Sequence, residues 1–326
     1  MASGRNNSRI YINIRGGLGN QLFCYFAGEY LRFLLNTRVV YLYDSKSNVH
    51  HKTNSNIYSF NLSNKPIKTK SLKFCLYTFR IVLISLPQVI KKILSGMKIR
   101  DIVVSTIFEE VYDEKPITYF EQSMLIKEWV TNSKCNEFYL RGLFQDFDYF
   151  DNQPQKKITL LDSSTWFKKV SLKLNAIRPI ILHVRLGDYL VEKENGLGVL
   201  STDYYREAII KVRKNLPSTE VWVFSNETSK AKILLSPIID DKFKFIEEAE
   251  QQDPAEVLLA MSLGGAIIVS NSTFSLWSAK LSDSRCIVIV PEPFFRKNFI
   301  RSGSFPKSWE YVESKWLSEK QIKSLC

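Results

Sequence analysis

Short apolar runs alternate with longer amphipathic stretches along the second half of this 326-residue chain. The runs have the length of buried strands and fall at residues 178–184, 220–226, 243–248, 266–271 and 286–293. Start signals such as Ser201, Thr202 and Pro254 lie between the runs, and they predict helices at residues 201–216, 253–265 and 272–282. Strands that alternate with helices in this way predict a parallel sheet.

The first half of the chain begins with the same alternation. It predicts strands at residues 9–14 and 38–43, with a glycine loop at 15–21 and a helix at 20–35 between them. A further strand, which runs into a short helix, is predicted at residues 137–150. The polar stretch 151–157 contains a proline and is the best candidate for a linker.

The predicted fold class is α/β, with two parallel sheets and a cleft between them. A prior of roughly 150 residues per domain favours two domains for a chain of this length. We place the boundary within the linker, which gives an N-terminal domain over residues 1–155 and a C-terminal domain over residues 156–326.

The formal net charge of +12 is concentrated in one segment. Residues 45–100 contain eleven Lys and Arg residues and no Asp or Glu. Within them, the basic amphipathic segment 65–100 is typical of a surface that rests on anionic lipid headgroups, which predicts a peripheral membrane contact. The alternative is a solvated basic face over a buried helix. Zinc-finger, RNA-recognition and helix-turn-helix signatures are missing from the sequence, so no nucleic-acid partner is expected.

Apolar segments and cysteines indicate the compartment. The N-terminal apolar run, residues 10–14, is too short for the core of a signal peptide. The longest apolar stretch, residues 74–90, is interrupted by Arg80, Pro87 and Gln88, so we do not expect it to span a membrane. Five scattered cysteines suggest reduced thiols. Together these features predict a cytoplasmic protein, with contact at the inner face of the membrane through the basic segment.

Three junctions between a strand and the following loop could carry chemistry. In RGGLGNQ, residues 15–21, glycines such as Gly17 and Gly19 let the backbone approach a ligand closely. In VSNSTFSLWS, residues 269–278, hydroxyl groups and free backbone N–H groups at a helix start could bind a diphosphate. The alternative is that these side chains only cap the helix.

The third junction is PIILHVRLGDY, residues 179–189, in which a buried strand delivers His183, Arg185 and Asp188 to the edge of a sheet. A guanidinium can hold a phosphate with two parallel hydrogen bonds, which makes Arg185 the central candidate. The alternative is a structural ion pair between Arg185 and Asp188.

Several catalytic classes are disfavoured by the motifs. The chain has three histidines and no HExxH, CxxC or GxSxG pattern, so zinc hydrolysis and Ser-His-Asp hydrolysis are not expected. The tripeptide Asp146-Phe147-Asp148 resembles a metal-binding DxD, but nothing else nearby is typical of a metal site. We therefore expect no metal and no cofactor, and assign charge on a leaving group to Arg185 and to donors at a helix start.

Six blocks occur in the order seen in α-1,2-fucosyltransferases of glycosyltransferase family 11. They are RGGLGNQLF, RGLFQDFDYF, HVRLGDY, LSTDYYREAI, VFSN and SNSTFSLWSAKL. The chain resembles this family over roughly residues 9–40 and 137–295. The resemblance implies a GT-B-like fold of two Rossmann-like domains that face a central cleft. It also implies metal-independent, inverting transfer of L-fucose from GDP-fucose to the 2-hydroxyl of a terminal galactose on a glycan, such as a lipid-linked O-antigen intermediate.

Roles for individual residues follow from the same resemblance. Arg185 would hold the β-phosphate of the donor, and His183 and Asp253 would face the guanine. The rest of the implied donor site is made of Ser225, Ser272, Thr273, Phe274 and Ser275. On the fucose and acceptor side, the implied residues are Gly17, Gly19, Asn20 and Gln21.

The chain departs from the family pattern in two places. Ser225-Asn226-Glu227 stands where bacterial members often have SxD or SDD, and NSTFSLWSAK replaces NSTFSWWGAW. The general base is open between Asp188 and Asp44, because an inverting transfer needs a group that accepts the proton of the acceptor hydroxyl. Two other functions remain: a GT-B glycosyltransferase with another nucleotide sugar, and a non-catalytic phosphate or polyanion binder.

Overall fold

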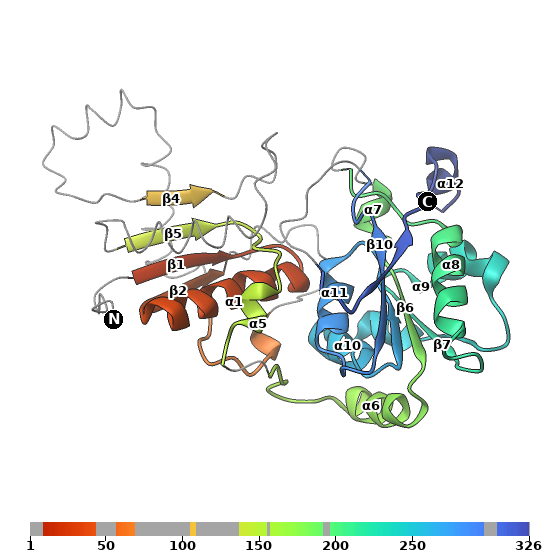
Figure 1. Ribbon diagram of the computed structural model, residues 1–326, viewed down its shortest axis with the longest axis horizontal. Coiled ribbons are helices and arrows are strands. Elements are labelled where there is room, and N and C mark those ends of the chain that lie inside the picture. The colour runs from red at the N-terminus through yellow and green to blue at the C-terminus, as the bar shows by residue number, and fades with distance from the viewer. Residues whose placement is uncertain are drawn as a thin grey trace, which may run out of the picture. The chain divides into compact units, whose positions relative to one another are not determined.

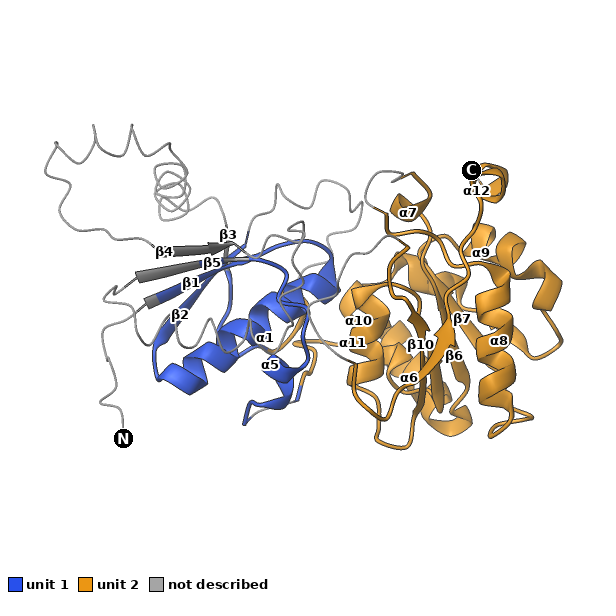
Figure 2. Cartoon of the chain, turned by 45° about the horizontal axis from the view of Figure 1, so that its top comes forward, with its two compact units in different colours: residues 1–52, 62–157, 302–304 blue, residues 53–61, 158–301, 305–326 orange. Residues whose placement is uncertain are grey.

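The computed structural model describes residues 9–43, 57–68, 105–108, 137–154, 157–191, 196–296 and 305–325. The chain forms two compact units (Figure 2). Unit 1 is residues 1–52, 62–157 and 302–304, and unit 2 is residues 53–61, 158–301 and 305–326. The chain leaves unit 1 after Lys157, close to the linker that the sequence predicts, and the short stretch 53–61 belongs with unit 2.

Unit 1 is built on a parallel sheet with the strand order β3-β2-β1-β5-β4. The strands are β1 (Arg9–Ile14), β2 (Arg38–Tyr43), β3 (Ile67–Lys68), β4 (Ser105–Phe108) and β5 (Glu137–Arg141). Helix α1 (Leu18–Leu35) connects β1 to β2, and the short α5 (Asp148–Asp151) follows β5. Alternate residues of β1, from Ile10 to Ile14, are fully buried, and α1, which packs on this strand, buries Leu22 and Phe23. Period-two burial on the strand and a buried helix face give the first core.

A buried carboxylate ties α1 to a distant segment of unit 1. Glu29 is 4% exposed, and its oxygens accept hydrogen bonds from the Tyr41 hydroxyl at 2.6 Å and from Asn64 Nδ2 at 2.8 Å. Arg32 Nη2 adds an ion pair at 2.9 Å. Burial and the neighbouring Glu29 carboxylate raise the pKa of Tyr41 well above its usual value, so this hydroxyl stays a donor. The cluster fixes residue 64 against the helix.

Unit 2 is built on a second parallel sheet, with the order β11-β10-β9-β6-β7-β8. Its strands are β6 (Ile180–Val184), β7 (Val221–Ser225), β8 (Phe243–Phe245), β9 (Ala266–Ile268), β10 (Ile287–Glu292) and β11 (Glu310–Glu313). Its helices are α6 (Thr165–Ile177), α7 (Asp188–Val191), α8 (Thr202–Arg213), α9 (Thr228–Leu235), α10 (Pro254–Met261), α11 (Thr273–Lys280) and α12 (Glu319–Leu325). Three 3-10 helices cover Ile57–Ser59, Ser236–Ile238 and Glu247–Gln251.

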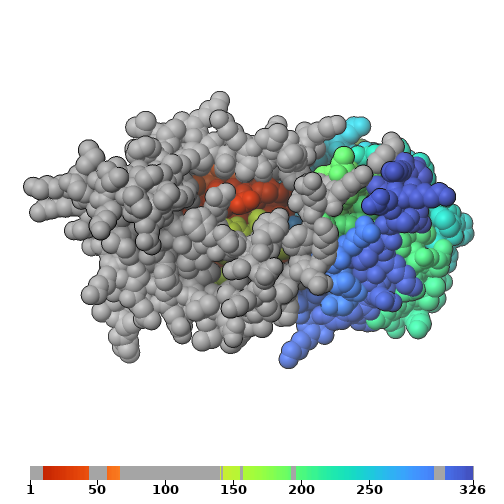
Figure 3. Space-filling view, turned by 90° about the horizontal axis from the view of Figure 1, so that it is seen from above, coloured from red at the N-terminus to blue at the C-terminus, as the bar shows by residue number. Residues whose placement is uncertain are grey.

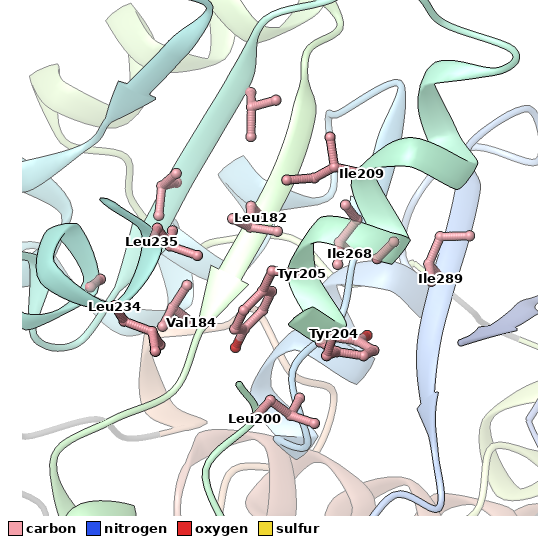
Figure 4. Close-up of a cluster of buried hydrophobic side chains, with 14 of the residues drawn as sticks. Leu182, Val184, Leu200, Tyr204, Tyr205, Ile209, Leu234, Leu235, Ile268 and Ile289 are labelled. Atoms are coloured by element: carbon pink, nitrogen blue, oxygen red, sulfur yellow. The ribbon is translucent and has the colours of Figure 1, made fainter. Parts of the chain in front are cut away.

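Helices cover both faces of this sheet. Helices α10 and α11 lie on one side of the strands, and α8 and α9 lie on the other (Figure 1). Every residue of β6 and β7 is buried, as expected for central parallel strands. Tyr204 and Tyr205 of α8 belong to a hydrophobic core cluster with Leu182 and Val184 of β6 (Figure 4). The last described residues, in dark blue, lie on the surface of unit 2 (Figure 3).

The basic amphipathic segment 65–100 lies outside the described residues except for residues 65–68, and Asp44 lies outside them as well. In the part of the chain that the structure describes, no helix has the length and apolar character needed to cross a membrane.

Candidate functional site

The sheet of unit 2 has a topological switch point between β6 and β9. From β6 the chain adds β7 and β8 on one side of the sheet, and then adds β9, β10 and β11 on the other. In open α/β sheets, ligands bind at the carboxyl ends of the strands where the connections diverge in this way. Arg185 follows β6, Ser225 ends β7, and Ser272 follows β9. The topology therefore brings the predicted donor residues of three neighbouring strands to one edge.

Arg185 forms an ion pair with Asp188, which was the alternative to ligand binding. It also keeps one N–H donor without a partner among the described residues. Its Nη2 lies 2.7 Å from Asp188 Oδ1, and its Cζ lies 5.3 Å from the centroid of the Tyr189 ring. Its Nε is buried and has no hydrogen-bond partner in the described part of the chain. A buried N–H without a partner is costly, which makes this nitrogen a candidate donor to an anion. Asp188 and Tyr189 thus hold the guanidinium in place, while its Nε–H is left without a hydrogen-bond partner within the described ranges.

The backbone between Arg185 and Asp188 is held by the neighbouring strand. The Leu186 N–H donates a hydrogen bond to Asn226 Oδ1 at 3.0 Å. Asn226 directly follows the last residue of β7. Gly187 has a φ of +63°, and a Cβ at this position would lie 2.5 Å from Asn226 Nδ2. Glycine therefore meets a conformational and a steric requirement of this turn.

Replacing Gly187 with alanine should lower the affinity for the nucleotide that the resemblance implies about tenfold, because the αL conformation costs an alanine about 1–2 kcal/mol and the turn must shift away from Asn226. Isothermal titration calorimetry on folded protein measures the loss. In an Asn226→Ala background the steric part of the penalty is absent, so Gly187→Ala should then cost less. Equal penalties in the two backgrounds would contradict the steric contribution.

His183 is a buried, neutral member of this edge. It is 4% exposed, and its Nδ1 lies 2.7 Å from Ser270 Oγ. Its ring centroid lies 5.7 Å from that of Phe274. Burial, and next the positive charge of Arg185, lower the pKa of His183 to about 3. At neutral pH the imidazole is uncharged, so it can exchange hydrogen bonds with a ligand or a neighbour but is a weak base.

The start of α11 combines capping with available donors. Ser272 is the N-cap, and its Oγ accepts a hydrogen bond from Phe274 N at 3.4 Å. Ser275 is fully buried, and its hydroxyl donates to Ser272 O at 3.1 Å. The capping interpretation thus holds for Ser272, whereas the Ser275 hydroxyl bonds back to a backbone carbonyl. Thr273 is partly exposed in the first turn, where a helix presents N–H groups that have no partner within the helix. This turn can still bind an anion.

Two further predicted donor residues have local partners. Ser225 Oγ accepts a hydrogen bond from Glu227 N at 3.0 Å at the end of β7. Asp253 is the exposed N-cap of α10, and its carboxylate accepts from Ala255 N at 2.8 Å and from the Ser59 hydroxyl at 2.5 Å. The second contact explains in part why residues 53–61 belong to unit 2. A guanine at Asp253 would have to share or displace the Ser59 hydrogen bond.

The predicted acceptor-side residues lie at the corresponding edge of unit 1. Gly17 is the N-cap of α1, and Gly19 is buried in its first turn. Gln21 is fully buried and donates from Nε2 to Gly16 O at 2.8 Å, so it fixes the glycine loop from inside. Asn20 is partly exposed, and its Oδ1 accepts from Gln145 Nε2 at 3.0 Å. Asn20 is therefore the side chain of this group that is best placed to meet a ligand.

Asp146, in the tripeptide that resembles a metal-binding DxD, serves the backbone. It is 3% exposed, and its Oδ1 accepts from Asp148 N at 2.7 Å at the start of α5. Among the described residues, no three His, Cys, Asp or Glu side chains gather as metal ligands would.

Three residues at these edges are missing from the sequence-based site. Ser270 contacts His183, Tyr189 contacts Arg185, and Gln145 contacts Asn20. Tyr189, Gln145 and Ser270 all lie inside recognised blocks, namely HVRLGDY, RGLFQDFDYF and SNSTFSLWSAKL. Their position in these blocks was the signal that could have found them.

Comparisons with known proteins show the family to which the chain belongs. The sequence profile of glycosyl transferase family 11 matches residues 9–313. The O-antigen biosynthesis glycosyltransferase WbnK of Escherichia coli is 24% identical to this chain, over 89% of the chain and 96% of its own length. The alpha-1,2-colitosyltransferase of Escherichia coli is 27% identical, over 53% of this chain and 61% of its own length.

A solved structure shares the fold. The crystal structure of the glycosyl transferase family 9 protein from Veillonella parvula DSM 2008 is similar over 100% of this chain and 92% of its own, with a TM-score of 0.52 and 11% sequence identity. At this identity the likeness concerns the fold alone. The predicted fold class, GT-B-like with two Rossmann-like α/β units, is confirmed.

Proposed function

The chain belongs to glycosyl transferase family 11, and on that premise we propose that this glycosyltransferase moves L-fucose from GDP-fucose to the 2-hydroxyl of a terminal galactose, with inversion. The acceptor oxygen bonds to the anomeric carbon as the bond from that carbon to the GDP phosphate breaks. The hydroxyl proton passes to a base, and the bonding electrons leave with GDP. Stabilising that leaving charge is the main task of the site.

The unpartnered, buried Nε of Arg185 at the switch point of unit 2 is the observation that carries this proposal. Arg185 would bind the β-phosphate with this N–H, while Asp188 and Tyr189 keep the guanidinium in place. The first turn of α11 would add donors around Thr273 and its cap Ser272. Arg185 and the first turn of α11 could together offset the negative charge that develops on GDP. We therefore propose that transfer needs no metal.

The remaining proposed roles are those that the family resemblance implies. His183 and Asp253 would contact the guanine, and Ser225, Phe274 and Ser275 would shape the donor site around them. In unit 1, Asn20 and the backbone of Gly17 and Gly19 would contact fucose or acceptor. Asp188 braces Arg185, and Asp44 is the second candidate for the general base.

The name of the relative WbnK supports an acceptor from O-antigen synthesis. We extend the proposal to a galactose-terminated glycan, carried on a lipid, that the enzyme meets in the cytoplasm at the membrane surface through residues 65–100. A second candidate differs only in the donor. The other relative is named for transferring colitose, so a different sugar on the nucleotide is the main alternative.

A nucleotide panel tests the donor. We expect GDP to raise the unfolding free energy by about 2.7 kcal/mol at a hundred times its Kd, and UDP and ADP to stabilise much less. Thermal shift assays measure this difference. The panel is followed by incubation of GDP-fucose with β-galactosides, with and without EDTA. If GDP stabilises no better than UDP, the assignment of a guanine nucleotide fails; loss of transfer in EDTA would overturn metal independence.

A further inference from the structure

We infer that Tyr189 is a positioning residue that couples the two diphosphate-binding elements of unit 2, the β6 loop and the start of α11. The inference rests on the proposed function, because it concerns how the site holds the donor diphosphate. Tyr189 lies in α7, four residues after Arg185, and its side chain is half-buried. Its ring also packs against the hydrophobic core of unit 2, so a test of its role has to separate packing from positioning.

The ring of Tyr189 supports Arg185 directly. The guanidinium carbon lies 5.3 Å from the ring centroid, within the range of a cation–π contact. Asp188 takes Nη2 of the same guanidinium at 2.7 Å. A flat aromatic surface and one carboxylate hold the guanidinium from two sides, which leaves Nε for a ligand. An aliphatic side chain could fill the space but would not attract the cation.

The hydroxyl of Tyr189 reaches across the switch point. It donates a hydrogen bond to Asn271 O at 3.1 Å, 82 residues further along the chain. Asn271 directly precedes Ser272, the N-cap of α11. Its own Nδ2 donates to Leu197 O at 2.7 Å, which anchors it to the loop before α8. Tyr189 therefore joins the guanidinium of one strand end to the helix start that follows the next strand.

This bridge has a consequence for binding. A diphosphate that contacts both Arg185 and the first turn of α11 needs these groups at a fixed separation. The Tyr189 bridge sets that separation before the donor arrives, so less conformational freedom is lost on binding. Removing the hydroxyl should loosen the link to Asn271, and removing the ring should also release Arg185.

Two substitutions separate these contributions. Tyr189→Phe keeps the ring and loses the hydroxyl, so the Kd for GDP should rise about threefold to tenfold. Tyr189→Leu loses both, and the Kd should rise about thirtyfold. Since developing charge on GDP needs the oriented guanidinium, kcat should fall in the leucine variant and recover most of its value in the phenylalanine variant.

Tyr204→Phe is the matched control. Its hydroxyl donates to Val269 O at 2.6 Å, two residues from Asn271 in sequence, and the buried Tyr204 belongs to the core cluster of α8. A purely structural role for Tyr189 predicts that Tyr204→Phe and Tyr189→Phe have the same effect on GDP binding. We expect the control to lower the melting temperature while leaving the Kd for GDP within about twofold of the wild type, since the Arg185 bridge is intact.

The experiment measures GDP affinity by calorimetry and donor kinetics for the wild type and the three variants, and for Tyr189→Leu combined with Arg185→Lys. If Tyr189 acts through Arg185, the leucine substitution adds little once Arg185 is replaced. Equal GDP affinity in the wild type and Tyr189→Leu, or full additivity in the double variant, would overturn the inference. Failure of the wild type to bind GDP would instead reject the proposed donor, so the two failures are distinguishable.

Discussion

Replacing Arg185 with lysine should lower kcat at least about a hundredfold, which is the usual cost of losing an oriented donor to a developing negative charge. Lysine keeps the positive charge and can still pair with Asp188. It lacks a rigid fork, however, and cannot present the buried Nε–H that Arg185 offers. Steady-state kinetics with varied GDP-fucose should show the loss mainly in kcat, because the charge on GDP grows during the reaction.

Arg213→Lys is a matched control for this prediction. Arg213 also pairs with an aspartate, Asp240, at 2.7 Å, and it also has buried nitrogens without a partner in the described part of the chain. Arg213 is the last residue of α8, which runs from the carboxyl ends of the strands back to the edge where the strands begin. It therefore lies at the opposite edge of the sheet from the site. If both lysine variants keep full activity and lose similar stability, Arg185 is a structural ion pair and the proposed mechanism is wrong.

The central strands and helices of unit 2 could be predicted from the sequence, because the residues within each element signal its type and its ends. The residues of β6 and β7 are buried without exception, so each strand reads as an apolar run. Helix α10 has Pro254 in its first turn and Asp253 as its N-cap, and α11 has Ser272 as its cap. Signals of this kind need no knowledge of distant residues.

Elements that depend on distant partners were missed, or were predicted with the wrong bounds. Helix α6 buries only Val170 and Leu174 of its thirteen residues, which is too few to give an apolar period, and its cap Ser164 is held by Glu256 of α10. The edge strand β11 buries only Val312. Strand β8 is shorter than predicted, because a 3-10 helix begins at Glu247. Tertiary contacts, rather than local preference, determine these elements.

The same distinction applies to the site. The ion pair between Arg185 and Asp188 lies within one turn of chain and was a stated alternative. The contacts of His183 with Ser270 and of Tyr189 with Asn271 join residues 87 and 82 positions apart. They exist because β6 and β9 are neighbours in the sheet, which the order of elements along the chain does not determine. Strand order therefore had to be known before these partners could be found.

The buried His183 should make unit 2 sensitive to acid. Its pKa is about 3 in the folded protein and near 6.5 when exposed. Above pH 6.5 the imidazole is neutral in both states and has no effect on the pH dependence. Between pH 6.5 and 3 the unfolded chain takes up a proton that the folded chain does not, so stability falls with pH at up to about 1.4 kcal/mol per unit. At pH 5 the loss should reach about 2 kcal/mol relative to pH 7.

His183→Asn isolates this contribution, because an amide can still bond to Ser270 but does not titrate. Urea unfolding of both proteins between pH 7 and 5, followed by tryptophan fluorescence, reports mainly on unit 2, to which five of the six tryptophans belong. The carboxylates are common to both proteins, so their titration cancels in the difference. The wild type should lose about 2 kcal/mol more than the variant over this range. Parallel pH profiles would mean that His183 is protonated in the folded state, and an imidazolium beside Arg185 would then contribute positive charge to the donor site.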